Sequence, residues 1–395
     1  MSDASGTQRL YYDDAALRRF SATIVALGDS GRRVYLDRSA FYPTSGGQPH
    51  DTGLLADIAV VDVVDEDERV AHCLAEPIGL PVGAMVVGQV DSARRQDFMQ
   101  QHTAQHLLSA LLSDRYGWPT VSVHFGDVTS TVDVSGVEGL SSAQLTRIER
   151  EVNEAIVANH PVTVSYEDAA TVSGLRKASD RDGVLRIVSI EGLDRSACGG
   201  THVSRTGELG MLLLRGAEKT RGHTRIEYVC GERAVNRARA DAELLARTAR
   251  PLSAAPEDLP VLVPRQLERL AEQDAEIRRL RKTLAQYEAQ ALWQQTAPDA
   301  SGIRRLRHEV DGPVKDAEAL AQACVALGHG VMLVTSRTTG GVLLATAADS
   351  AVDAGASLKA ALQAVGGRGG GSPRLAQGSV PDIARLPELL SALGF

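Results

Sequence analysis

Two pairs of metal-binding residue types, far apart in the chain, place the strongest constraint on how it can fold. His102 and His106 stand four residues apart in HTAQHLL, and Cys198 and His202 stand four apart in SACGGTH. Helical spacing places the first two imidazoles one turn apart on the same face. The glycines of the second pair allow a tight turn that can aim a thiolate and an imidazole at one point. If both pairs bind one ion, two distant segments must meet.

Three imidazoles and one thiolate match the ligands that zinc prefers in proteins. We therefore predict one Zn²⁺ per chain, bound by His102, His106, Cys198 and His202. Two alternatives stay open. Four protein ligands describe a closed structural site, whereas a catalytic zinc keeps a position for water or substrate. Cys198 can also be a nucleophile that a nearby histidine activates.

The pattern of apolar residues divides the chain into four predicted domains and indicates an α+β fold class. Residues 1–91 carry short alternating runs broken by Gly, Pro and Asp, which predicts a β-rich, barrel-like domain. Residues 92–231 alternate helical and strand patterns, which predicts a two-layer α+β domain that holds both ligand pairs. Residues 232–296 predict a helical hairpin or coiled-coil arm, and residues 297–395 predict a compact α/β module with a glycine cluster.

The charge distribution limits the partners that the chain can take. A net charge of −8 argues against binding nucleic acid over the whole surface. Lys219, Arg221 and Arg225 form a local basic group that can collect phosphates, although a solvated Arg-rich helix nearby is an equally good explanation of the local charge. The N-terminus lacks the features of a signal peptide, and no apolar run approaches the roughly 20 residues that span a bilayer. We therefore expect a cytoplasmic protein with no membrane partner.

The motifs taken together resemble those of a known family. HTAQHLL, SACGGTH, TGELG and EKTRGHTRIEYVCG resemble the zinc motif and surrounding strands of the editing domain of alanyl-tRNA synthetases and of the stand-alone AlaX proteins. FYPTSGGQPHDTG resembles the glycine-rich loop of the preceding β-domain, and GGRGGGSPRLAQGS resembles the signature of the tRNA-binding C-Ala domain. Threonyl-tRNA synthetases carry a related zinc motif, but the other two motifs favour the alanine family. The resemblance implies the long form of AlaX, with no aminoacylation core expected before the β-domain.

The resemblance implies a zinc-dependent hydrolase that releases serine or glycine from mischarged tRNA(Ala). Zinc there can polarise the carbonyl, activate water or anchor the substrate amino group. Thr44 is the candidate sensor of the serine hydroxyl, with Gln48 beside it, unless their loop is only a tight turn. His124 is a candidate pocket residue, although a satisfied strand histidine explains it better. A non-catalytic tRNA-binding protein with a structural zinc is the rival function.

Two segments are candidates for RNA binding. Lys219, Arg221 and Arg225 are expected at the acceptor end of the tRNA. The glycine loop containing Gly367, Arg368, Gly369 and Gly370 is expected at the tRNA body, where backbone N–H groups without obstructing side chains can approach phosphates. The coiled-coil-like arm can pair between two chains or fold back on its own helix, so a homodimer through it or the C-terminal module stays open.

Overall fold

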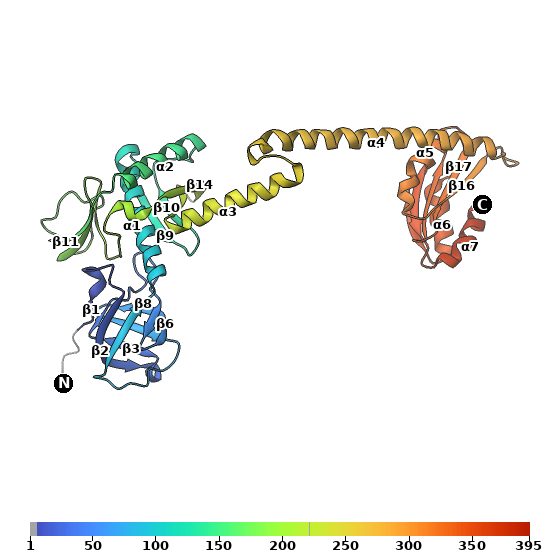
Figure 1. Cartoon of the computed structure of the whole chain (residues 1–395). Helices are drawn as coiled ribbons and strands as arrows, with labels where there is room; N and C mark the ends of the chain where they lie inside the picture. The colour runs from blue at the N-terminus through green and yellow to red at the C-terminus, as the bar shows by residue number, and fades with distance from the viewer. Residues whose placement is uncertain (1–5, 221) are drawn as a thin grey trace. The chain divides into compact units, whose positions relative to one another are not determined.

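The computed structural model describes residues 6–220 and 222–395 and divides into two compact units, Met1–Thr248 and Ala249–Phe395. Figure 1 shows the order of their elements along the chain. Helices and several separate sheets occur together, so the predicted α+β class is confirmed. Within the described ranges, no helix combines the length and the apolar character needed to cross a membrane.

Short strands with alternating buried and exposed residues build the N-terminal part of the first unit. They are β1 (Gln8–Arg9), β2 (Arg19–Gly28), β3 (Arg33–Leu36), β4 (Arg38–Ser39), β5 (Gly53–Leu55), β6 (Ile58–Glu66), β7 (Arg69–Leu74) and β8 (Met85–Val90). Six of them pair in the order β2-β3-β7-β6-β5-β8, and β8 pairs with β2, so this sheet closes on itself. Ile24, Val34 and Val63 are fully buried in the apolar cluster that these strands form.

The rest of the first unit combines three helices with two further sheets. Its elements are α1 (Ser92–Tyr116), β9 (Thr120–Phe125), β10 (Ser130–Val134), α2 (Ser142–Val157), β11 (Val162–Asp168), β12 (Val184–Ile190), β13 (Asp194–Ala197), β14 (Leu212–Thr220), β15 (His223–Cys230) and α3 (Glu232–Ala249). One sheet has the order β14-β15-β10-β9 and the other β11-β12-β13. Helices alternate with strands here, as predicted for residues 92–231.

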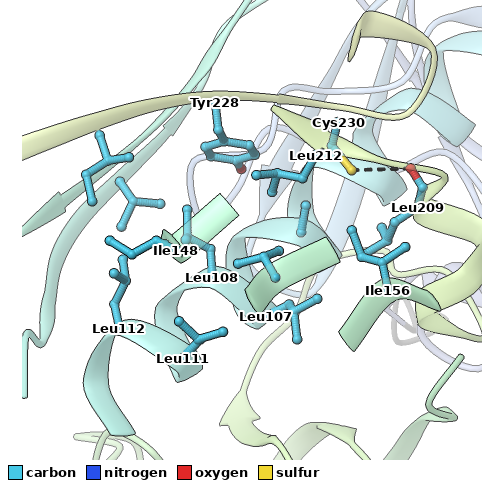
Figure 2. Packing of buried hydrophobic residues seen from close by; sticks show 14 of the residues in the cluster. Leu107, Leu108, Leu111, Leu112, Ile148, Ile156, Leu209, Leu212, Tyr228 and Cys230 are labelled. Atoms are coloured by element: carbon cyan, nitrogen blue, oxygen red, sulfur yellow. Dashed lines mark hydrogen bonds between the residues drawn. The ribbon is translucent and has the colours of Figure 1, made fainter. Parts of the chain in front are cut away.

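Helix α1 is the central element of this part. It begins where the Asp91 carboxylate accepts hydrogen bonds from two backbone N–H groups of the first turn, and it ends at Gly117, whose φ of 69° suits a residue without a Cβ. Leucines of its second half are buried against α2 and against Tyr228 of β15 (Figure 2). Burying one such leucine stabilises the fold by about 1.5–3 kcal/mol. This burial therefore holds α1 against α2 and against strands β10 and β15.

A buried ion pair attaches α1 to the glycine-rich loop at residues 41–49. The Arg95 guanidinium donates to the Asp51 carboxylate, and both side chains are almost completely buried. The same carboxylate accepts from the backbone N–H of Tyr42 at 2.7 Å. Since an unpaired buried charge is costly, this pair fixes the loop against the start of the helix. The loop consequently lies beside His102, two turns further along α1.

The second unit is a five-stranded sheet with helices packed around it. Its elements are α4 (Leu259–Gln295), β16 (Arg304–Val310), α5 (Glu318–Val325), β17 (Gly330–Ser336), β18 (Gly341–Thr346), α6 (Ala354–Ala364), β19 (Arg368–Gly371), β20 (Leu375–Ser379) and α7 (Leu386–Leu393). The strand order is β16-β17-β18-β20-β19, and only β16 and β17 pair in parallel. Helices and strands occur together here, as expected of the α/β module predicted for residues 297–395.

Two faces of α4 differ in what they contact. Ala285 and Ala289 are buried in an apolar cluster with β16, β17 and α5. Within the predicted coiled-coil arm, apolar residues at 3-4 spacing form a seam, which consists of Ile277, Leu280, Leu284, Tyr287 and Ala291. The first three are about half exposed, at 47%, 52% and 57%. The seam is therefore separate from the face that holds the helix on its own unit.

The glycine cluster, expected to be a loop, is instead mostly an edge strand. Arg368–Gly371 form β19, which pairs antiparallel with β20. A Cβ at Gly369 would lie 2.6 Å from the Cα of Gly378, and a Cβ at Gly367 would lie 2.6 Å from the backbone oxygen of Ser379. The glycines allow the neighbouring strands β19 and β20 to approach each other closely within the sheet. The local sequence does not reveal this tertiary requirement. Their backbone groups on the β20 side are consequently used by the sheet.

Candidate metal centre and active site

Four side chains from two segments converge on one point in the first unit. His102 and His106 come from α1, and Cys198 and His202 come from the turn that follows β13. Their four ligand atoms all lie within 4.8 Å of one another. Cys198 Sγ is 3.4 Å from His102 Nε2 and 3.3 Å from His202 Nε2. The fold thus brings together the two pairs that the sequence singled out.

The other ring nitrogen of each histidine has a hydrogen-bond partner outside the cluster. Nδ1 of His102 is 2.8 Å from Gln48 Oε1, Nδ1 of His106 is 2.8 Å from Asp194 Oδ2, and Nδ1 of His202 is 3.1 Å from Thr103 Oγ1. Histidines that bind metals characteristically donate Nδ1–H to such a partner, which fixes the tautomer and leaves Nε2 free to bind the ion. The donor set and its supporting contacts therefore fit a zinc ion.

The electrostatics of Cys198 and His202 favour the protonation states of metal ligands. At His106, by contrast, burial lowers the pKa but the hydrogen bonds to Asp194 and Cys198 outweigh it and raise the pKa to about 9. Burial by itself would raise the pKa of the Cys198 thiol, but the neighbouring imidazoles of His102 and His202 hold that pKa well below its ordinary value. Burial and the charge of His102 lower the pKa of His202 to about 3. A thiolate and a neutral imidazole are the forms that bind metal. They are also the forms that a thiolate nucleophile would use, so the pKa values alone do not choose between the two roles.

Close packing in the SACGGTH turn explains one of its two glycines. A Cβ on Gly200 would overlap the imidazole ring of His102 and would lie 3.2 Å from Gln48 Oε1. A Cβ on Gly199 would lie in ordinary contact with Tyr12, 3.6 Å from its hydroxyl oxygen. The second glycine is thus needed for the close approach of the turn to the helix, which the sequence interpretation attributed only to flexibility.

A cavity of about 410 Å³ opens beside His106. Its lining comes from residues 120–123 of β9 and from residues 176–181, in the segment between β11 and β12. Gln105 and Ser196 also line it. The cavity combines hydroxyl, amide and charged side chains next to the cluster, so its chemistry suits a polar ligand.

The two loop residues proposed as sensors occupy different positions. Gln48 is fully buried, and its side-chain nitrogen donates to Thr201 while its oxygen contacts His102. Thr44 is exposed, and its hydroxyl contacts both the backbone N–H and the ring Nδ1 of His50, each at 3.1 Å. Gln48 therefore orients a histidine of the cluster, whereas the hydroxyl of Thr44 is already used within its own loop.

His124 lies on β9 as predicted, but its side chain is exposed and does not line the cavity. Val123 lines the cavity instead, and Phe125 lies 4.9 Å from His102, measured between ring centroids. The lining of this cavity therefore does not include His124, and the interpretation as a strand histidine stays a prediction.

The predicted basic group is largely neutralised by carboxylates. Lys219 forms an exposed salt bridge with Glu138, and Arg225 pairs through two nitrogens with Asp133. The third residue of the group, Arg221, lies outside the described residues. The candidate acceptor-end surface is therefore less positive than the sequence order of these residues indicates.

Two residues next to the cluster were missed in the sequence. Asp194 contacts His106, and Arg176 donates to Asp194 at 2.8 Å. Asp194 precedes Cys198 by four residues, and this proximity to a ligand was the only available signal. Along the sequence, β12 lies between Arg176 and the ligand Cys198. The surrounding residues, GLRKASDRDG, are typical of a surface loop and do not distinguish Arg176 from other surface arginines.

Comparison with known proteins places the chain among relatives of synthetases. Residues 185–227 match the Threonyl and Alanyl tRNA synthetase second additional domain, and residues 314–394 match the DHHA1 domain. An alanine–tRNA ligase of Methanoculleus marisnigri is 33% identical over 402 residues, which is 97% of this chain and 42% of that ligase. That of Natronomonas pharaonis is 30% identical over 411 residues, 99% of this chain and 44% of the ligase.

The C-Ala domain of Aquifex aeolicus alanyl-tRNA synthetase is a structural match with 18% sequence identity and a TM-score of 0.22, covering 25% of this chain and 90% of that domain. The chain spans less than half the length of the ligases quoted above. It is homologous to the region of alanyl-tRNA synthetases that holds the second additional domain and the DHHA1 domain. This make-up is consistent with a long-form AlaX-like protein.

Proposed function

We propose that the chain is a cytoplasmic trans-editing hydrolase that cleaves the ester between serine, or glycine, and the terminal adenosine of mischarged tRNA(Ala). The observation that carries the proposal is the convergence of three imidazoles and one thiolate beside a polar cavity. Homology over almost the whole chain to alanine–tRNA ligases supports the choice of tRNA(Ala). An aminoacyl ester needs little beyond positioning and stabilisation of the developing oxyanion.

His102, His106, Cys198 and His202 would hold the metal. A bound zinc supplies Lewis acidity for attack of water on the ester carbonyl. Gln48, in contact with His102, keeps one imidazole in the orientation that the cluster requires. The cavity next to His106 would take the aminoacyl group and keep bulk water away from it.

Gln105 is our candidate for recognising the serine hydroxyl, in place of Thr44. It immediately precedes His106, is only 5% exposed, and lines the cavity. Its side-chain nitrogen donates to Ser109 at 2.7 Å, which directs the amide and leaves Oε1 as an acceptor for a ligand hydroxyl. A site that pairs with a hydroxyl discriminates against the analogue lacking it better than an apolar pocket does.

The decisive experiment follows hydrolysis of seryl-, glycyl- and alanyl-tRNA(Ala) by the zinc-loaded chain, with threonyl-tRNA as an unrelated ester. We expect release of serine or glycine, retention of alanine, and loss of activity after a chelator removes the metal. Absence of any ester hydrolysis by a chain that contains zinc would refute the proposal.

The closed character of the cluster favours a second candidate, a non-catalytic tRNA-binding protein with a structural zinc. Four protein ligands leave no obvious position for substrate on the ion. This candidate predicts that tRNA(Ala) binds while every ester survives, and that metal removal unfolds the first unit. The hydrolysis experiment therefore separates the two functions.

The second unit is our candidate for binding the body of tRNA(Ala). Its compactness allows a direct test, because the shortened chain 1–296 removes the sheet and α5 to α7 while keeping the metal cluster. We expect the shortened chain to bind tRNA(Ala) more weakly and to keep one zinc per chain. It should form a homodimer only if the exposed seam of α4 pairs between chains. Unchanged tRNA affinity in the shortened chain would contradict the assignment.

A further inference from the structure

A continuous chain of contacts runs from the wall of the cavity to one ligand of the cluster. Nδ1 of His106 lies 2.8 Å from one oxygen of Asp194, and Nε of Arg176 donates to the other oxygen, also at 2.8 Å. The hydroxyl of Ser196 donates to the same carboxylate and accepts from Nη2 of Arg176 at 3.1 Å. Arg176 and Ser196 thus fix the orientation of the carboxylate that contacts His106.

The buried carboxylate requires a positive partner. The side chain of Asp194 is 0% exposed and that of Arg176 is 16% exposed. Removing an ionised carboxylate from water is costly unless it is paired and hydrogen-bonded. A histidine that binds a metal through Nε2 is neutral, so it donates a hydrogen bond but supplies no charge of its own. Arg176 is then the cation that pairs with the Asp194 carboxylate on the side away from His106.

Arg176 also belongs to the cavity. It lies in the segment between β11 and β12, and it lines the cavity together with the following residues up to Arg181. Nε and Nη2 of Arg176 are used by Asp194 and Ser196, and among the described residues Nη1 has no hydrogen-bond partner. A ligand oxygen in the cavity can therefore contact the same guanidinium that supports the metal ligand.

We propose that Arg176 is a positioning residue that couples occupation of the cavity to the orientation of His106 through Asp194. The coupling deepens the proposed function, since the aminoacyl end of the tRNA is the expected occupant. Arg176 acts by holding the carboxylate that holds the imidazole. It does not itself attack the ester.

The chain offers a matched control in Arg195. This residue lies between Asp194 and Ser196 on β13, but it points to the other side and binds the backbone oxygen of Ser173 and the carboxylate of Glu167. Removing its side chain loosens the same segment between β11 and β12 without touching Asp194. Arg176→Ala, Arg176→Lys and Arg195→Ala therefore separate a specific effect on the cluster from general loosening of the cavity wall.

The experiment measures Co²⁺ binding to the metal-free full chain, by affinity and by the visible absorption band of the bound ion. Arg176→Ala should lower Co²⁺ affinity by about 10- to 100-fold, as loss of partners behind metal ligands usually does, and should alter the band. Arg176→Lys retains the charge but loses the planar guanidinium that contacts Asp194 and Ser196 through two nitrogens, so we expect a smaller loss. Arg195→Ala should leave affinity and band unchanged.

Kinetics on seryl-tRNA(Ala) provide a second measurement: Arg176→Ala should lower kcat more than it raises KM. Parental Co²⁺ affinity and absorption in Arg176→Ala, or an equal change in Arg195→Ala, would overturn the inference. If Arg176→Ala does not fold by circular dichroism, the comparison of Arg176→Lys with Arg195→Ala decides. If the parental chain hydrolyses no ester, the proposed function fails, while the Co²⁺ comparison still tests whether Arg176 positions His106 through Asp194.

Discussion

Substituting Gly200 by alanine tests whether the SACGGTH turn must approach helix α1 as closely as the structure shows. The added Cβ would overlap the imidazole of His102, so the ring or the turn has to move by about 1 Å to restore ordinary van der Waals separation. Metal–ligand distances vary by only about 0.2 Å in well-formed sites. A displacement of that size therefore removes His102 from the ligand set or distorts the turn that holds Cys198.

Loss of partners behind a ligand lowers metal affinity by about 10- to 100-fold, and displacement of a ligand itself should cost at least that much. The expected loss for Gly200→Ala is therefore 10-fold or more, equivalent to at least about 1.4 kcal/mol of binding free energy. Competition with a chromophoric chelator measures zinc affinity, and hydrolysis of seryl-tRNA(Ala) should fall in parallel if the proposed function holds.

Gly199→Ala is the matched control because its Cβ would contact only Tyr12, 3.6 Å from the hydroxyl oxygen. This variant should keep parental zinc affinity. Equal affinities for Gly200→Ala, Gly199→Ala and the parental chain would refute the reasoning, since His102 would then not be held where the structure places it. A similar loss in both variants would show instead that the turn needs two flexible residues.

Three further predictions concern pH, specificity and the glycine strand. Burial lowers the pKa of His72 to about 4 from an ordinary value of 6.5, so the unfolded chain binds its proton first and stability should fall by about 2 kcal/mol between pH 7 and pH 5. Urea denaturation should show this loss in the parental chain and not in His72→Gln. The same change in the free energy of unfolding with pH in both chains would contradict the prediction. Gln105→Met should slow hydrolysis of seryl-tRNA(Ala) by about 2- to 10-fold, the value of one hydrogen bond, while Thr44→Val should not; the opposite order in single-turnover rates would restore Thr44 as sensor. Gly369→Ala should destabilise the second unit by about 1–3 kcal/mol, whereas Gly370→Ala, whose Cβ meets open space, should change its thermal unfolding little; equal melting temperatures would argue against the pairing of β19 with β20.

The sequence by itself determined the residues of the cluster. Histidine and cysteine are the side chains that zinc prefers, and each pair, His102 with His106 and Cys198 with His202, is positioned by local geometry alone. A helical repeat and a glycine turn span only a few residues, so the pattern along the chain contains the necessary information. The long helices and the principal strands were predictable for the same reason, because their periodicity is local.

Only the tertiary structure decided which residues support or neutralise those local features. Gln48 and Asp194 become partners of the histidines because the glycine-rich loop and β13 pack against α1. Arg225, expected to meet RNA, is paired with Asp133 on a neighbouring strand, and Gly369 belongs to a strand because β20 lies against it. Hydrogen bonds and ion pairs between distant segments depend on which surfaces are buried together, and a one-dimensional pattern does not encode that pairing.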